Sequence, residues 1–448
     1  MKIGNVNRLA SWLSSRSLSW TRIRQIGFSG ADQAFSVGGM FLVNVALART
    51  QSKEEYGVFT LSYSVFTFLA GLHNATILEA YTIHGAGRYH ANFPAYARLL
   101  WRKNAALLFA LTATLVLAWR VLGWVAPAFA SHTVLGLALT CGLFLMASFL
   151  RRTFYVRHRP DLAAKFSAIF FVTCLTLLWI SIRIGILTGF CAYSIVAVSW
   201  SIAAIFVASE FPTGPASRKF EDIEPDYWAQ HWRYSRWVFA TAFVFQLMTQ
   251  GYYWLAAGFL SVKEVGDLRA LYNVVTPVDQ VFIALVLLIL PLMSFRYSSQ
   301  QVKGLVPLWR AYCVGCIAIT CSFAAFVSIF GKQVIHLLYA GKFDDVAPLV
   351  TTLALLPVVT GIGNTINAAL KAMEQPKVVF YAYALSGLTT FVVGIPLVTR
   401  LGLHGAIYGM VASAAVYTST MGIAFYWFVR KSRTWMPVSA TVKEDSSF

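Results

Sequence analysis

The sequence predicts an all-α polytopic membrane protein with about 12 transmembrane helices in two six-helix lobes, and three observations lead to this fold class. Of the 448 residues, 58% are hydrophobic and only 12% are charged, against about 45 to 50% and about 25% in soluble domains. Long apolar segments recur along the whole chain, and a short motif recurs in its two halves. Lysine and arginine are concentrated in alternate connections between the apolar segments. Together these features exclude a soluble protein.

The recurring motif marks the start of a helix in each half. Residues 52–57 read Ser-Lys-Glu-Glu-Tyr-Gly, and residues 261–266 read Ser-Val-Lys-Glu-Val-Gly, 209 positions later. In both copies a serine precedes a glutamate by three residues, which is the pattern of a capping box. In that motif the hydroxyl accepts a hydrogen bond from the backbone amide three residues on, and the carboxylate accepts one from the amide of the cap residue.

Two further pairs of segments indicate that the chain is a duplication. Arg159-Pro160 is repeated as Gln375-Pro376 at an offset of 216, and the Arg183 to Ile186 segment as Arg400 to Leu403 at an offset of 217. The matches occur in the same order and their offsets differ little. We therefore interpret each half as one copy of a unit of about 200 residues.

The apolar segments are long enough to be transmembrane helices, which need about 20 mostly apolar residues to cross a hydrocarbon core of about 30 Å. We expect twelve spans, near residues 28–49, 57–80, 104–126, 133–150, 163–182, 189–210, 236–260, 268–294, 309–330, 347–371, 378–399 and 404–429. Six spans per half return the chain to its starting side. We therefore expect the halves to be related by a pseudo-two-fold axis along the membrane normal, with the transport pathway between them.

These spans divide the chain into five parts. The first is a basic amphipathic segment, 1–27, which either lies in the inner membrane interface or forms a partly disordered leader. It is followed by an N-terminal lobe, 28–211, a cytoplasmic linker, 212–235, a C-terminal lobe, 236–430, and a cytoplasmic tail, 431–448. We expect no soluble domain.

The net charge of +18 reflects orientation in the membrane. With a cytoplasmic N-terminus, most of the 36 lysines and arginines fall in cytoplasmic connections, as the positive-inside rule predicts. The basic balance then indicates contact with anionic membrane lipids and no nucleic-acid partner. All six cysteines lie inside predicted spans, so we expect neither a disulfide nor a metal site.

Polar residues form a stripe on the eighth span. At about 100° per residue, four of them fall within about 60° of one another on a helix: Arg269, Asn273, Thr276 and Gln280. The offset of 209 places a matching stripe on the second span, at Thr60, Ser64, Thr67 and Gly71, which Asn74 extends by one turn.

Polar groups inside a bilayer face protein or water, so we expect both stripes to line a substrate cavity. The alternative is that their side chains join helices within each lobe. On the seventh span, Gln246 and Gln250 share a face with Tyr253 and are further candidates for the cavity wall.

Arg269 is the strongest candidate for a substrate contact. It lies about two turns inside its helix, where an unpaired cation costs at least about 2.5 kcal/mol unless it is solvated or reaches the interface. A guanidinium in a cavity offers bidentate hydrogen bonds to phosphate. We therefore hypothesise that Arg269 contacts a phosphate group of the substrate.

Two acidic residues are candidates for ion coupling. Asp279 lies in the eighth span shortly after Pro277, where it either binds a cation or proton or serves as a structural partner of another helix. Asp32 lies in the first turn of the first expected span, so helix capping is the alternative there. His73 lies opposite the stripe of the second span, and we interpret it as a packed histidine in preference to a proton relay.

Two segments also resemble a known family. The run from Leu47 to Phe59, Leu-Ala-Arg-Thr-Gln-Ser-Lys-Glu-Glu-Tyr-Gly-Val-Phe, is similar to the junction of the first two helices in bacterial polysaccharide flippases of the Wzx type, within the multidrug/oligosaccharidyl-lipid/polysaccharide (MOP) exporter superfamily. A late block is similar too, from Leu338-Tyr339-Ala340-Gly341-Lys342-Phe343 through Asn364, Asn367 and Gln375-Pro376-Lys377 to Gly402-Leu403-His404-Gly405-Ala406.

The resemblance implies an alternating-access transporter in the bacterial cytoplasmic membrane, with both termini in the cytoplasm. It would flip a polyprenyl-pyrophosphate-linked oligosaccharide from the inner to the outer leaflet for surface polysaccharide or exopolysaccharide synthesis, driven by a cation gradient or the membrane potential. Membrane lipids and other polysaccharide assembly proteins are the implied partners, and no cofactor is implied. Such families line the cavity with several basic residues, whereas here Arg269 is the main candidate.

Two other functions compete with this one. A drug or metabolite exporter of the same superfamily exchanges organic cations for sodium or protons and needs acids in its cavity, for which Asp279 and Asp32 are candidates. A membrane-embedded polysaccharide polymerase or glycosyltransferase needs a sizeable external loop or a catalytic acid pair. The one external pair, Asp344-Asp345, lies in a short connection, and the duplication favours a transporter.

Overall fold

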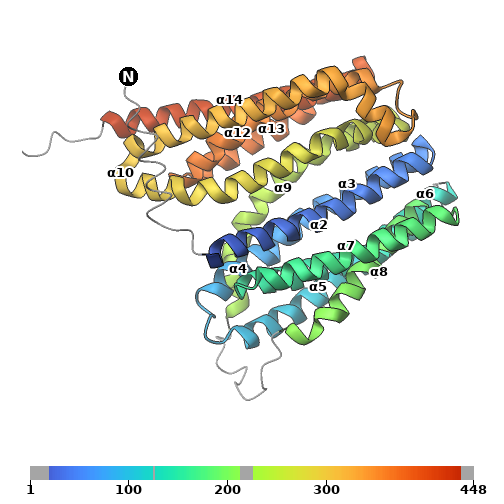
Figure 1. The fold of residues 1–448 in the computed structure, drawn as a ribbon, viewed down its shortest axis with the longest axis horizontal. Helices are drawn as coiled ribbons and strands as arrows, with labels where there is room; N and C mark the ends of the chain where they lie inside the picture. Colours follow the sequence, from blue (N-terminus) through green and yellow to red (C-terminus); the bar gives the residue numbers. More distant parts are fainter. Residues whose placement is uncertain (1–19, 125–126, 212–225, 435–448) are drawn as a thin grey trace, which may run out of the picture. The chain divides into compact units, whose positions relative to one another are not determined.

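The computed structural model describes residues 20–124, 127–211 and 226–434, and the regular structure in these ranges is helical (Figure 1). The chain divides into two compact units, 1–243 and 244–448. The first unit contains α2 (Trp20–Thr50), α3 (Lys53–His73), η1 (Asn74–Leu78), α4 (Glu79–Ala86), α5 (Phe93–Leu122), α6 (Ala128–Val156), α7 (Pro160–Arg183), α8 (Gly189–Val207), η2 (Ala208–Glu210) and the first part of α9 (Tyr227–Phe259).

The second unit begins inside α9. It continues with α10 (Val262–Tyr339), η4 (Ala347–Leu349), α11 (Val350–Leu353), α12 (Leu355–Ala372), α13 (Pro376–Val392) and α14 (Gly394–Thr434). Two of these helices contain sharp breaks, α10 at Gln301 (φ 52°, ψ −143°) and α14 at Gly402 (φ 61°, ψ −136°). Each break separates two of the expected spans, so the helices account for about twelve spans, as the sequence predicts.

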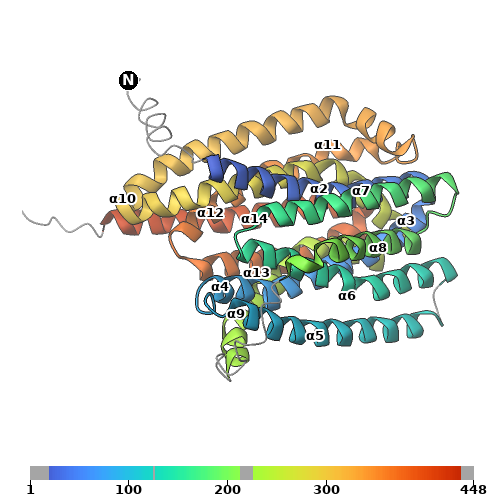
Figure 2. The same ribbon diagram turned by 60° about the horizontal axis from the view of Figure 1, so that its bottom comes forward.

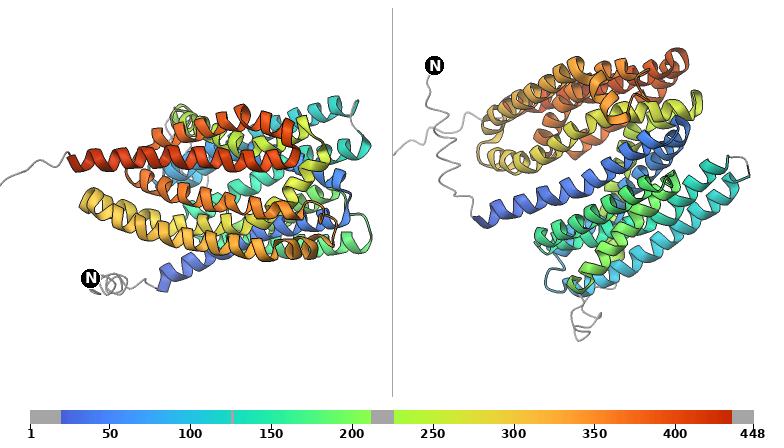
Figure 3. Two further views of the ribbon diagram at one scale, coloured as in Figure 1. Left: turned by 90° about the horizontal axis from the view of Figure 1, so that it is seen from above. Right: turned by 45° about the vertical axis from the view of Figure 1, so that its right-hand side comes forward.

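Nine helices in the described ranges are long and apolar enough to cross a membrane. Among them α10 counts once, although it contains two spans. In the first unit α2 packs on α7, and α6 packs on both α5 and α8 (Figure 2). In the second unit α12 packs on both α10 and α14, and α13 packs on α14 (Figure 3). Large apolar side chains remain exposed on the outer faces, such as Phe109 on α5 at 78%, as expected for contact with lipid.

The ends of the expected segments differ from the elements of the structure. The first 19 residues of the basic segment lie outside the described residues, as do 212–225 of the linker and 435–448 of the tail. The rest of the expected linker is helical, because α9 begins at Tyr227 and the boundary between the units follows Phe243. The helix therefore starts before its apolar part.

The internal repeat is visible in the backbone. Both α7 and α13 begin at a proline, and the residue two positions earlier is left-handed in each case, His158 with φ 56° and Glu374 with φ 58°. The paired glycines also match, Gly185 with φ 73° and Gly402 with φ 61°. Glycine adopts this conformation without steric cost. The two halves therefore share turn geometry as well as sequence.

The two predicted capping boxes form only in part. Ser52 is the N-cap of α3, and its hydroxyl accepts from the Glu55 amide at 3.1 Å. Ser261 is the N-cap of α10, but its hydroxyl makes no bond to a backbone amide and donates to the Glu264 carboxylate instead. Both helices start where the sequence predicts, although the second cap uses a different hydrogen bond.

Candidate functional site

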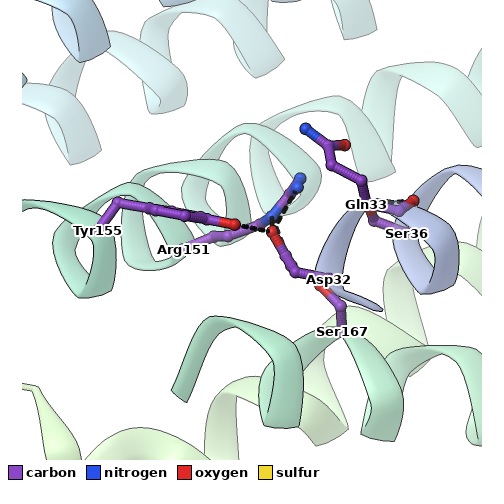
Figure 4. Close-up of polar contacts among 6 residues, drawn as sticks. All are labelled: Asp32, Gln33, Ser36, Arg151, Tyr155 and Ser167. Atoms are coloured by element: carbon purple, nitrogen blue, oxygen red, sulfur yellow. Dashed lines mark hydrogen bonds and ion pairs between the residues drawn. The ribbon is translucent and has the colours of Figure 1, made fainter. Parts of the chain in front are cut away.

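The first unit contains a fully buried carboxylate, Asp32 on α2, which is surrounded by donors from α6 and α7 (Figure 4). Arg151 donates from Nε to both carboxylate oxygens at 2.8 Å, and its Nη2 lies 2.7 Å from Oδ2. The Tyr155 hydroxyl donates to Oδ2 at 2.6 Å, and the Ser167 hydroxyl donates to Oδ1 at 2.5 Å. Each oxygen of Asp32 therefore has at least two donors.

Helix geometry explains how these four residues meet. Arg151 and Tyr155 are four residues apart on α6 and so lie on one face of the helix. The contact between α2 and α7 is close because Gly39 has no side chain; a Cβ there would lie 2.7 Å from Cε1 of Phe170. Phe170 is itself held by stacking on Trp200, with ring centroids 3.9 Å apart. This close approach brings Asp32 within reach of Ser167.

The structure corrects the capping interpretation of Asp32. We expected the residue in the first turn of a helix, but α2 begins at Trp20, so Asp32 lies in the helix interior. Its charge is compensated by Arg151 across the helix interface, not by a helix N-terminus. The sequence placed the helix start too late because it identified only the apolar part of the helix.

A second arginine lies beside this cluster. Arg152 is half-buried and donates from Nη2 to the side-chain oxygen of Asn74 at 2.9 Å. Within the described part of the chain, this is the one hydrogen bond that its guanidinium makes. The other N–H groups of Arg152 are thus available to an acceptor that is not part of the described chain. Arg152 thus links α6 to Asn74, which extends the second-span stripe.

The start of α9 packs against the same region of the first unit. The backbone carbonyl of Thr76 accepts from His231 Nε2 and from the Ser235 hydroxyl, both at 2.8 Å. Because a carbonyl can only accept, His231 carries its proton on Nε2. Its Nδ1 lies 3.4 Å from the Tyr96 hydroxyl, which is therefore the donor.

Two other polar contacts in this unit are structural. The Tyr234 hydroxyl donates to Glu79 Oε1 at 3.1 Å, so the carboxylate at the end of the second span is partnered. His73 is buried, and its Nε2 lies 2.8 Å from Oδ1 of Asn104, a buried amide on α5. This agrees with our interpretation of His73 as a packed histidine.

The remaining residues of the second-span stripe bond within their own helix or lie buried. Thr60 and Ser64 are buried, and the Ser64 hydroxyl donates to the Leu61 carbonyl at 2.6 Å. Thr67 is half-buried and donates to the Tyr63 carbonyl at 2.9 Å. These contacts do not by themselves assign the stripe to a cavity.

In the second unit, Asn273 connects the two parts of α10 that lie before and after its break at Gln301. Its Nδ2 donates to the Tyr339 hydroxyl at 3.3 Å, and that hydroxyl donates to the Ala270 carbonyl at 3.0 Å. Asn273 is buried and its partner lies in the same unit. These contacts agree with the alternative interpretation, in which polar side chains join helices within a lobe. Thr276 donates to the carbonyl of Tyr272 at 3.2 Å.

Of the other candidates in the second unit, Gln246 is buried and the rest are half-buried. Asp279 accepts from the Tyr272 hydroxyl at 2.9 Å, two turns away on the same helix. Gln246 and Gln250 on α9 are both linked to the Thr249 hydroxyl, at 3.4 Å. Arg269 and Gln280 are also half-buried. The structure thus places one stripe on α3, which Asn74 extends into η1, and the other on the first part of α10, before its break at Gln301.

Sequence reasoning missed several residues of the first unit, above all Arg151 and Arg152. They lie at the end of the fourth span, and we counted them only as part of a cytoplasmic connection. One signal was present, since a buried acid in a membrane protein requires a cation at similar depth. The i, i+4 pairing of Arg151 with Tyr155 was a second signal.

Comparisons with known proteins identify the fold. No protein-family model matches the chain, and no curated protein matches its sequence. Among solved structures, it is similar to a multidrug resistance MATE family transporter of the MOP superfamily, with a TM-score of 0.77 to the inward-facing form, 14% identity, and coverage of 90% of this chain and 96% of the other. For the outward-facing form the TM-score is 0.67, at 14% identity and coverage of 92% and 96%.

A third similar structure is a MOP superfamily transporter from Pyrococcus furiosus, for which a binding pocket of reverse polarity has been described as suggesting a different function. Its TM-score is 0.67, at 14% identity and coverage of 92% of this chain and 96% of the other. The chain therefore has the all-helical, two-lobed fold of MATE transporters.

We predict that Asp32→Ala destabilises the protein by about 3 kcal/mol, because it leaves the Arg151 guanidinium without its partner in a poorly solvated site. The free energy of unfolding of the detergent-solubilised protein measures this. Asp161→Ala is the matched control, since it removes an ion pair to Arg159 whose side chains are 34 to 47% exposed and should cost less than about 1 kcal/mol. Equal losses for the two variants would contradict a structural role for the buried pair.

Proposed function

We propose that this protein is an alternating-access transporter that flips a polyprenyl-pyrophosphate-linked oligosaccharide from the inner to the outer leaflet. The proposal rests on one observation, namely which partners the charged side chains of the first unit have. The Asp32 carboxylate accepts hydrogen bonds from Arg151, Tyr155 and Ser167. Arg152, which follows Arg151 on α6, has N–H groups that donate to no described residue. Such a site suits an anion better than a cation.

The chemistry of the substrate fits this arrangement. A pyrophosphate presents several charged oxygens, and a guanidinium binds such groups through two parallel hydrogen bonds. In our proposal Arg152 in the first unit contacts the pyrophosphate, and Arg269 in the second unit is a further candidate for a phosphate contact. The stripe residues Thr60, Ser64, Thr67 and Asn74, together with Asn273, Thr276, Gln280, Gln246 and Gln250, line or support the path of the head group, while the lipid tail remains in the bilayer.

The fold is compatible with more than one type of substrate. Solved structures that resemble this chain include transporters named for multidrug resistance and one whose pocket is described as having reverse polarity. The proposed flippase, in the Wzx-type branch suggested by the sequence resemblance, is a further use of the same fold. The proposal places it in the bacterial cytoplasmic membrane with both termini in the cytoplasm, alongside other polysaccharide assembly proteins.

The second candidate is a cation-coupled multidrug or metabolite exporter. Two observations favour it. A similar solved structure is named as a multidrug resistance transporter, and the half-buried Asp279 carboxylate accepts a single described hydrogen bond, from the Tyr272 hydroxyl. Asp32 is less suited to cation binding in the arrangement observed, because a cation would have to displace Arg151.

The two functions are separated by one experiment on the reconstituted protein. Proteoliposomes receive either a fluorescent polyprenyl-pyrophosphoryl sugar, whose outward movement is detected with a membrane-impermeant quencher, or an organic cation whose efflux is recorded. We expect protein-dependent movement of the lipid-linked sugar. Movement of the organic cation alone would replace the flippase with the exporter.

The same vesicles test the two arginines. Arg152→Ala and Arg269→Ala should each slow flipping at least about tenfold, because each loses a charge-assisted hydrogen bond to phosphate that is worth about 1.5 to 3 kcal/mol. The corresponding lysine variants should retain part of the rate, since they keep the charge but not the bidentate geometry. Arg183→Ala is the control, because this exposed side chain lies over the Trp179 ring. Unchanged rates in both alanine variants would exclude these contacts.

Asp279 is the proposed coupling group. Asp279→Asn preserves a side-chain oxygen that can accept from Tyr272, but it removes the charge. We expect flipping by this variant to become independent of an imposed sodium or proton gradient, while the concentration of substrate at half-maximal rate stays the same. A gradient dependence equal to that of the wild type would remove Asp279 from this role.

A further inference from the structure

The second span is interrupted by a π-turn, η1, whose sequence is Asn-Ala-Thr-Ile-Leu. The amide of Glu79 donates to the carbonyl of Asn74, five residues earlier, so one residue more than usual is accommodated in this turn. Such turns are rare in α-helices and occur frequently at functional sites. This one contains neither proline nor glycine, which are common local causes of a helix distortion. Its Thr76 hydroxyl donates to the Leu72 carbonyl of the same helix at 2.5 Å, and further support comes from outside the helix.

That support comes from the start of α9. His231 and Ser235 are one helical turn apart, both are fully buried, and both donate to the Thr76 carbonyl in the middle of η1. In a π-turn the shift from i−4 to i−5 bonding leaves a carbonyl without its usual amide donor, and such a group must find other donors when it is buried. Tyr96 fixes the orientation of the His231 ring by donating to its other nitrogen.

The π-turn determines where Asn74 lies, and Asn74 is the hydrogen-bond partner of Arg152. A π-turn holds one residue more than a regular α-helical turn. If it reverted to regular α-helix, the two parts of the span would rotate relative to each other by about 100°, the angle that one residue takes up. Asn74 lies at the junction of these two parts. The geometry of Asn74 and Arg152 therefore depends on the two donors of α9.

We propose that His231 and Ser235 are positioning residues for transport, which hold the π-turn so that Asn74 orients Arg152 toward the phosphate of the substrate. This inference rests on the proposed function. Neither residue needs to touch the substrate.

Two double variants and a control test the proposal, with a single variant in reserve. His231→Leu with Ser235→Ala removes both donors, whereas His231→Gln with Ser235→Thr keeps a donor at each position. Ser148→Ala is the matched control, because this half-buried hydroxyl donates only to the Phe144 carbonyl of its own helix. Ser235→Ala alone is the milder variant if the double variant does not assemble.

The first measurement needs no substrate. Hydrogen–deuterium exchange of the peptides that cover residues 74–86 should become at least about tenfold faster in the variant without donors, because two hydrogen bonds of about 1 kcal/mol each are lost. Exchange should return to the wild-type rate in the variant with donors and stay unchanged in Ser148→Ala. Unchanged exchange in the variant without donors would overturn the proposal.

The second measurement is flipping of the fluorescent polyprenyl-pyrophosphoryl sugar. We expect the apparent KM of the variant without donors to rise about tenfold, with the maximal rate changed less than about twofold, since Arg152 is misplaced but intact. Recovery of the KM by the Gln and Thr pair supports positioning, and a KM equal to that of the wild type overturns it. If the wild type moves only organic cations, the proposed function fails, and the exchange measurement alone decides whether α9 holds the π-turn.

Discussion

The Asp32 carboxylate has no exposed surface, and an ionised carboxylate in such a place is tolerated only with a charge partner and a full set of hydrogen bonds. Arg151, Tyr155 and Ser167 supply them from α6 and α7, so three helices must keep their spacing for the charge to remain compensated. The same pairing limits what Asp32 can bind, because a carboxylate whose oxygens are all engaged is a poor cation site.

Helix positions could be predicted from the sequence because their causes are local. Hydropathy located the spans, Ser52 and Ser261 marked the starts of two helices, and the repeated segments predicted a duplication that is visible at His158 and Glu374. The cap at Ser261 nevertheless bonds differently from the prediction. A local pattern therefore fixed the helix start more reliably than the individual hydrogen bond.

The polar partners could not be predicted in the same way, because they depend on which helices meet. Asp32 was assigned to a first turn because the helix continues into residues that are not apolar. Asn273 belongs to a stripe by its spacing, yet its partner is Tyr339, 66 residues later. The π-turn at Asn74 was not predicted, since two of the donors that hold it lie 155 and 159 residues away from Thr76, at His231 and Ser235. Periodicity gives the face of a helix but not its neighbour.

The two units share the same turn conformations, but their polar side chains differ in type and in partners. Position 60 is a buried threonine in the first unit, and its counterpart 209 residues later is Arg269. Conversely, the first unit compensates the buried Asp32 carboxylate with Arg151, whereas in the second unit the Asp279 carboxylate accepts from the Tyr272 hydroxyl at 2.9 Å. Turn geometry is set by local sequence and survives in both copies, whereas polar side chains are set by what they contact.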